Sequence, residues 1–169
     1  AVLALSALAI STTSAWATSP PNDDFADAVQ MSGPFQVVDS NTISSTVEAG
    51  EPIHWNSNSN MSTWFKWTAP SDGSVILSTC AAFAASYVQV YTGNAVNALS
   101  SVTNGSCRIS FDATAGTEYR IVVYPPSASN AGFFRLSLRQ YAKPANDDFA
   151  NAELLSGSSA STGQAKALC

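Results

Sequence analysis

The sequence predicts an all-β protein, a jelly-roll-like antiparallel β-sandwich of about eight short strands. Short segments alternate between apolar and polar side chains, and turn-forming residues separate them. No segment with helical periodicity longer than two turns follows residue 17. Hydrophobic residues make up 46% of the chain and charged residues 11%, so there is enough apolar material for a core and too little charge for a disordered chain.

The predicted strands follow one another along most of the chain. The clearer ones are Ser62–Thr68, Ser74–Thr79, Tyr87–Thr92, Cys107–Ala113, Thr117–Tyr124 and Phe133–Leu138, and weaker ones lie near Phe35–Val38 and Ile43–Val47. Pro70-Ser71-Asp72-Gly73 is a typical turn sequence, and it predicts that the strands on either side of it form a hairpin.

The N-terminal segment has the features of an export signal. Residues 1–10 form an apolar run, and Ala15-Trp16-Ala17 matches the small-residue pattern of a signal-peptidase site. The run is shorter than the roughly 20 apolar residues of a membrane-spanning helix. We expect residues 1–17 to be a signal-peptide remnant, and the alternative is a buried N-terminal strand or helix. A secreted or cell-surface location follows, with no membrane attachment after cleavage.

One motif occurs twice. Residues 20–28 read PPNDDFADA and residues 144–152 read PANDDFANA, with seven of nine positions identical at an offset of 124 residues. A period of this length corresponds to a whole domain. We therefore expect a β-sandwich module at 18–143 and the start of a second copy at 144–169, which would continue beyond this sequence.

The repeated motif opens with polar residues that have two interpretations. Asn22, Asp23 and Asp24 precede a short apolar stretch and predict the N-cap of one helical turn, with Phe25 closing the end of the sandwich. Clustered carboxylates are also ligands for Ca²⁺, which makes Asp23 and Asp24 weak calcium candidates. The motif lacks the alternating acids of a dedicated calcium loop, so we favour capping and expect no required cofactor.

The three cysteines are interpreted from the expected location. Cys80 ends one predicted strand and Cys107 begins another, and an exported chain permits a disulfide between them. The alternative is two unpaired, buried thiols. Cys169 would find its partner beyond this sequence.

Trp64, Phe65 and Trp67 place aromatic rings on both faces of one predicted strand. Either a loop such as 56–60 covers the second face, or Trp64 is exposed and stacks on a ligand ring. We favour burial, because aromatic side chains dominate protein cores.

Several motifs taken together resemble the bacterial pre-peptidase C-terminal domain family and its relatives in large secreted repeat proteins. The motifs are Asn22–Ala26, Glu48–Pro52, Thr63–Pro70, Val88–Gly93, Ala113–Tyr119 and Gly132–Phe134. The resemblance implies a jelly-roll-like sandwich beside a catalytic or adhesive region, itself non-catalytic, with some relatives binding calcium or an insoluble polymer. Ser86-Tyr87 and Asn104-Gly105-Ser106 depart from the acidic family pattern and weaken a conventional calcium or ligand site there.

The sequence argues against an enzyme. The single histidine, His54, excludes a zinc site of several histidines, and no Gly-x-Ser-x-Gly motif is present. We expect His54 to lie exposed in a polar loop rather than in a catalytic site. Seven Lys and Arg residues without a cluster, in a chain of net charge −5, also argue against nucleic-acid binding.

Two classes of function remain. The first is a non-catalytic structural or adhesive repeat of a larger secreted or cell-surface protein, with neighbouring modules as partners. The second is an accessory module that binds an extracellular polymer or carbohydrate and is attached to a secreted hydrolase such as a peptidase.

Overall fold

The computed structural model describes residues 18–80, 85–144, 146, 147, 149–152 and 154. The predicted signal remnant and Cys169 lie outside these residues. Nine strands form in the described part of the chain: β1 (Val29–Met31), β2 (Phe35–Asn41), β3 (Thr63–Thr68), β4 (Gly73–Ser78), β5 (Tyr87–Thr92), β6 (Ser100–Ser106), β7 (Arg108–Ala113), β8 (Glu118–Tyr124) and β9 (Phe133–Ala142). Three short 3₁₀ turns accompany them: η1 (Phe25–Asp27), η2 (Ala128–Asn130) and η3 (Phe149–Asn151).

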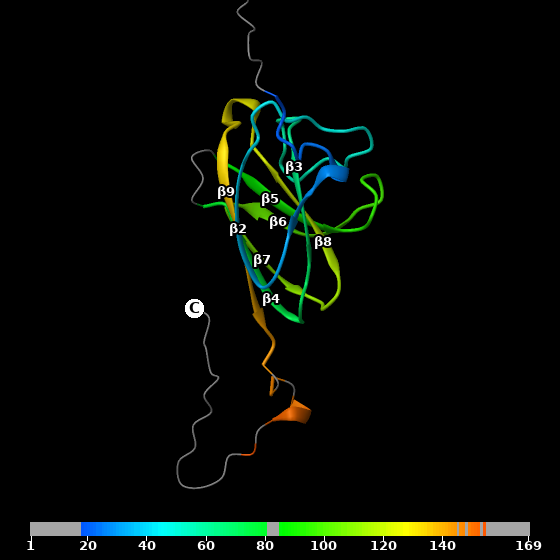
Figure 1. The fold of residues 1–169 in the computed structure, drawn as a ribbon, viewed down its shortest axis with the longest axis vertical. Coiled ribbons are helices and arrows are strands. Elements are labelled where there is room, and N and C mark those ends of the chain that lie inside the picture. The colour runs from blue at the N-terminus through cyan, green and yellow to red at the C-terminus, as the bar shows by residue number, and fades with distance from the viewer. Residues whose placement is uncertain (1–17, 81–84, 145, 148, 153, 155–169) are drawn as a thin grey trace, which may run out of the picture.

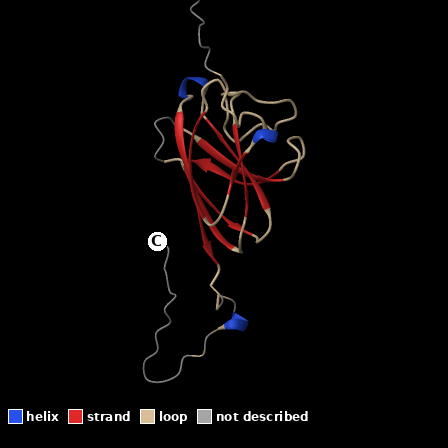
Figure 2. Ribbon diagram, viewed as in Figure 1, coloured by secondary structure: helices blue, strands red, loops and turns tan. Residues whose placement is uncertain are grey.

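The strands form two sheets that pack face to face, which confirms the predicted β-sandwich (Figure 2). The five-stranded sheet has the order β1-β3-β8-β5-β6, and the four-stranded sheet has the order β2-β9-β4-β7. The pair β1–β3 is parallel, and the other paired strands are antiparallel. No helix within the described ranges is long and apolar enough to cross a membrane.

The predicted hairpin at Pro70–Gly73 is wrong. β3 belongs to the five-stranded sheet and β4 to the four-stranded sheet, so the turn carries the chain from one layer to the other. Gly73 has φ +146°, and a Cβ there would lie 2.0 Å from the carbonyl oxygen of Tyr141 on β9. The turn sequence predicts a reversal of the chain, but it does not decide which strands pair.

The main core lies between the two sheets. It is made by the alternating inward side chains of the strands, as in β9, where every second residue from Phe134 to Gln140 is buried. Its members are Met31, Phe65, Trp67, Ala69, Val75, Leu77, Val88, Val90, Ile109, Phe111, Ala113, Tyr119, Ile121, Val123, Phe134, Leu136 and Leu138.

The outer face of the five-stranded sheet is also buried. A second cluster consists of Phe25, Ala28, Trp64, Tyr91, Val122 and Tyr124. The opening segment with η1 lies over this face, together with residues 42–62, which we call the covering loop (Figure 1). The predicted weak strand Ile43–Val47 forms part of this loop instead. β3 therefore buries aromatic residues on both faces: Phe65 and Trp67 pack between the sheets, and Trp64 packs beneath η1 and the covering loop.

The chain enters and leaves the sandwich at opposite ends. Figure 1 shows residue 18 at one end of the two sheets and the end of β9 at the other. Only Lys143 separates Ala142, the last residue of β9, from Pro144, where the repeated motif begins. The division into a module at 18–143 and a second copy at 144–169 stays a prediction.

Candidate functional site

The one histidine of the chain, His54, belongs to the covering loop and is buried between this loop and the five-stranded sheet. His54 is 3% exposed, and its Nε2 lies 2.6 Å from Oε1 of Glu51. Its Nδ1 lies 2.9 Å from the hydroxyl of Tyr91 on β5. The side chains of His54 and Glu51 are 2% and 0% exposed, so a hydrogen-bonded polar chain crosses the apolar second cluster.

The prediction that His54 is exposed is therefore wrong. Three aromatic rings surround its imidazole, with centroids 5.7 Å away for Trp64, 5.9 Å for Tyr91 and 4.9 Å for Tyr124. The polar stretch around His54 gave no sign of this, because its neighbours in space come from β3, β5 and β8.

The hydrogen-bonded chain of Glu51, His54 and Tyr91 resembles a catalytic relay of an acid, a base and a hydroxyl group. Its buried environment does not suit catalysis. Tyr91 is 3% exposed, so its oxygen is not accessible to a substrate. Desolvation raises the pKa of Tyr91, and the nearby Glu51 carboxylate raises it further, so the hydroxyl keeps its proton at neutral pH. The arrangement instead fastens the covering loop to the sheet by hydrogen bonds.

The opening motif fastens the same loop by different contacts. The side-chain amide of buried Asn22 donates to the backbone carbonyl of Trp64 at 2.9 Å. The backbone carbonyl of Asn22 accepts from the backbone amide of Trp64 at 2.8 Å. Asp23 accepts from both the backbone amide and the hydroxyl of Thr46, at 2.6 and 3.0 Å. Asp24 occupies the N-cap of η1, as predicted, but its side chain makes no capping hydrogen bond.

Phe25 completes this attachment and closes the second cluster. It therefore lies on the outer face of the five-stranded sheet, and the prediction that it closes the end of the sandwich is wrong. Its ring meets Trp64 edge-on at 5.2 Å, and the guanidinium of Arg120 lies 4.4 Å from its centroid. Its backbone amide donates to Oε2 of Glu48 at 2.5 Å. The motif therefore joins η1, the covering loop and β3.

The same local backbone geometry recurs at the second motif. The amide of Asp23 bonds to the carbonyl of Pro20 at 3.0 Å, and the amide of Asp147 bonds to that of Pro144 at 3.1 Å. η1 and η3 begin at Phe25 and Phe149, again 124 residues apart.

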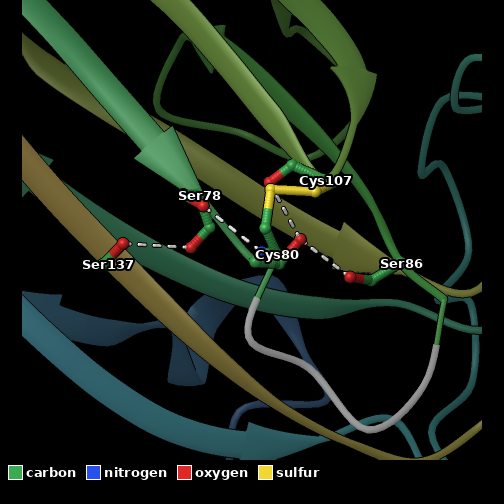
Figure 3. Close-up of a disulfide and its surroundings, with 6 residues drawn as sticks. Ser78, Cys80, Ser86, Cys107 and Ser137 are labelled. Atoms are coloured by element: carbon green, nitrogen blue, oxygen red, sulfur yellow. Dashed lines mark hydrogen bonds between the residues drawn. A yellow bond between two sulfur atoms is a disulfide. The ribbon is translucent and has the colours of Figure 1, made fainter.

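Cys80 and Cys107 form a disulfide, as predicted (Figure 3). Cys80 follows β4, and Cys107 lies between β6 and β7, where the chain passes from one sheet to the other. Cys107 has φ +56°, a conformation that is unfavourable for a residue with a side chain. Its carbonyl accepts from the Thr79 amide at 2.7 Å, and its amide donates to Ser86 at 3.2 Å. The bridge and these bonds hold one corner of the sandwich.

Trp64 cannot stack on a ligand, because it is fully buried. The exposed indole belongs instead to Trp55, which is 44% exposed at the far end of the Glu51–Trp55 stretch. The two tryptophans differ in sequence context, since Trp64 lies in a predicted strand with Phe65 and Trp67, and Trp55 precedes an Asn/Ser-rich stretch. Trp55 is the residue that the sequence reasoning missed.

A hollow of about 740 Å³ lies where β9 leaves the sandwich, and three of its lining residues are Asp72, Asp112 and Asp147. Asp72 accepts from the Ala115 amide at 2.8 Å, and Asp147 lies 3.5 Å from the Lys143 ammonium. In the part of the chain that the structure describes, no group of three acidic, histidine or cysteine side chains could hold a metal ion. The hollow therefore marks the exit of the chain toward the second motif.

Comparisons with known proteins identify no family model and no curated relative that matches the chain. Two solved structures are similar to it. The pre-peptidase C-terminal domain of collagenase from Bacillus anthracis is 11% identical, with 66% of this chain and 94% of that chain covered and a TM-score of 0.43. The K1 cleaved adhesin domain of Lys-gingipain from Porphyromonas gingivalis W83 is 13% identical, with 64% and 75% covered and a TM-score of 0.35. The first is the same kind of domain that the sequence motifs resemble.

Proposed function

We propose that this chain supplies a non-catalytic β-sandwich module of a larger secreted or cell-surface repeat protein, with a structural or adhesive role. The observation that carries the proposal is the return of the opening motif one residue after β9 ends, at the end of the sandwich opposite the entry of the chain. Modules joined in this way follow one another end to end.

The chemistry of the covering loop supports a structural role. The histidine, the acid and the tyrosine that could form a catalytic relay are used to fix the loop, inside the apolar second cluster. The disulfide suits an oxidising, extracellular environment.

Reading the coding sequence downstream of Cys169 tests this proposal. Further copies of the Asn-Asp-Asp-Phe-Ala motif at a spacing near 124 residues, each followed by a β-sandwich pattern, would support it. A stop codon that leaves the second copy incomplete would refute the repeat architecture. Scattering from a two-module protein then measures the arrangement: an end-to-end pair has about twice the maximum dimension of one module.

A second candidate is an accessory module that binds an extracellular polymer for an attached hydrolase. The exposure of Trp55 favours it, because an indole that is 44% exposed presents an aromatic surface to a ligand. A hydrolase domain in the downstream sequence would favour this candidate over the first.

A further inference from the structure

We propose that Trp55 and Tyr87 form a platform that binds the sugar rings of a neutral polysaccharide. This inference rests on the proposed adhesive or accessory function and names the surface and the class of ligand. Trp55 comes from the covering loop and Tyr87 from β5, and their ring centroids lie 5.3 Å apart at an interplanar angle of 66°.

The backbone of Trp55 is fixed on both sides by side chains of the sheet. Its amide donates to Oε1 of Gln89 at 2.8 Å, and its carbonyl accepts from the hydroxyl of Tyr124 at 2.7 Å. Gln89 is 6% exposed and Tyr124 is fully buried, so these anchors belong to the folded sheet. The adjacent His54 is fixed in the second cluster. A ring held in this way loses little conformational freedom when it binds a ligand.

The residue after Trp55 orients the second ring. Asn56 donates from Nδ2 to the Tyr87 hydroxyl at 3.1 Å. Asn56 has φ +53°, a conformation that is sparsely populated outside glycine and that persists only where neighbouring contacts maintain it. Two residues before the indole, Ile53 is 94% exposed, which extends the apolar surface of the loop.

The surroundings of the platform are polar and uncharged. The register places Ser106 opposite Tyr87 and Asn104 opposite Gln89, and cross-strand partners share one face of a sheet. Ser106 and Asn104 are exposed, and neither β5 nor β6 contains a charged residue. Aromatic faces suit the C–H surfaces of a sugar ring, while amides and hydroxyls suit its hydroxyl groups. An anionic polymer would require cations that these two strands lack.

The opposite sheet has a different chemistry and supplies the control. On the outer face of the four-stranded sheet, Phe133 is 61% exposed and Phe35 is 57% exposed. Three arginines share this face, at positions 108, 135 and 139, and the Arg139 guanidinium lies 5.2 Å from the Phe35 centroid. Phe133 on this sheet can therefore be replaced as a control without changing Trp55 on the covering loop.

The test for soluble polymers is affinity electrophoresis of the secreted protein in native gels that contain neutral β-glucan, xylan or galactomannan, or anionic polygalacturonate. For the insoluble polymers cellulose and chitin, the test is co-sedimentation. We expect at least one neutral polysaccharide to retard or bind the protein, and Trp55→Ala to weaken that binding about tenfold or more. Phe133→Ala should leave it unchanged. Trp55→Phe keeps a smaller ring and should retain part of the affinity, which gives a second measurement if Trp55→Ala lowers stability.

Three outcomes would overturn the platform: no binding to any neutral polymer, binding that survives Trp55→Ala in a folded variant, or binding to polygalacturonate alone. Binding that is lost in Phe133→Ala would move the ligand to the other sheet. These results are separate from the downstream sequence, since further repeats without sugar binding would leave the structural role intact and refute only the platform.

Discussion

The imidazole of His54 and the carboxylate of Glu51 lie 2.6 Å apart inside an apolar cluster, three residues apart on a loop without regular secondary structure. Burial of such groups is unfavourable unless each has a partner. Here each has one more: Tyr91 for the imidazole, and the backbone amide of Glu48 for the carboxylate, at 3.0 Å. The Glu48–Glu51–His54 contacts lie within the covering loop, and the hydroxyl of Tyr91 joins them to the sheet.

Removing one partner from this pair should destabilise the module. We expect Glu51→Ala to lower the free energy of unfolding by about 3 kcal/mol, because it leaves a buried imidazole without its acceptor. Chemical denaturation measures the change. The matched control is Asp39→Ala, which breaks the exposed Asp39–Arg135 pair on the other sheet and should have a much smaller effect.

The two sites on the loop should also be coupled. The double variant Glu51→Ala/His54→Ala should cost clearly less than the two single effects added together, because each single change already removes the shared bond. Additive effects, or a Glu51→Ala effect no larger than that of Asp39→Ala, would contradict the assignment of this pair to the stability of the loop.

Alkaline pH should destabilise the module through two buried tyrosines. Desolvation raises the pKa of Tyr91 and Tyr124 above the ordinary value of 10.0. Above about pH 10 these two tyrosines ionise in the unfolded state but stay protonated in the folded state. Their contribution to the free energy of unfolding is therefore fully present below about pH 10 and declines as the pH rises above it. The expected loss is about 1.4 kcal/mol per pH unit for each tyrosine.

Denaturation at stepped pH, with phenolate absorbance recorded in parallel, measures this decline. Tyr124→Phe should reduce the slope above pH 10 by about half, since one of the two groups is removed. If all five tyrosines ionise reversibly near their ordinary pKa while the protein stays folded, the burial of these two hydroxyls does not control stability at high pH.

How far the sequence predicts the fold depends on how each strand is buried. β9 has one buried and one wet face, so Phe134, Leu136 and Leu138 alternate and the strand is evident. β6 is an edge strand with no fully buried residue, and β1 has only three residues, so neither gives a recognisable pattern. The edge strand β7 was predictable because its residues alternate between buried and exposed, whereas β1 and β6, at the edges of the five-stranded sheet, were not.

The candidate site was less predictable, because its contacts are non-local. The burial of His54 comes from rings on three different strands, whereas its two neighbours in sequence, Ile53 and Trp55, are exposed. Trp64 is fully buried on the sheet and meets Phe25 of η1, whereas Trp55 lies at the surface of the covering loop. Cys80 and Cys107 were predictable, since both flank strands in a chain with an export-like segment.

The opening motif should be sensitive to substitution at one position and tolerant at another. Asn22→Ala leaves the Trp64 carbonyl without its donor in a buried position, and we expect a loss of about 1–3 kcal/mol in the free energy of unfolding. Asp24→Ala, two residues later, changes an exposed side chain that makes no capping bond and should lower stability by less than about 0.5 kcal/mol. Equal effects would show that the motif acts through capping after all.

Calcium should not alter the stability of the module. Both carboxylate oxygens of Asp23 already accept hydrogen bonds from Thr46, which leaves Asp24 as the only other acid of the initial Asn-Asp-Asp triplet. We expect the melting temperature to be the same in millimolar calcium and in chelator. A ligand that binds the folded state raises the melting temperature by mass action, so a clear rise with calcium would contradict this expectation.

The disulfide should contribute to stability mainly by restricting the unfolded chain. Cys80 and Cys107 are 27 residues apart, and closing a loop of that length is worth about 3–4 kcal/mol by the chain-entropy estimate. Replacing both with serine in a module of residues 18–143 should lower the free energy of unfolding by this amount. The fold should survive, because the Thr79–Cys107 and Cys107–Ser86 backbone bonds remain. Thiol labelling of the unfolded, non-reduced module checks the pairing directly: no reactive thiol is expected, and labelling of both cysteines would show that the bond is absent and that the backbone alone holds this corner.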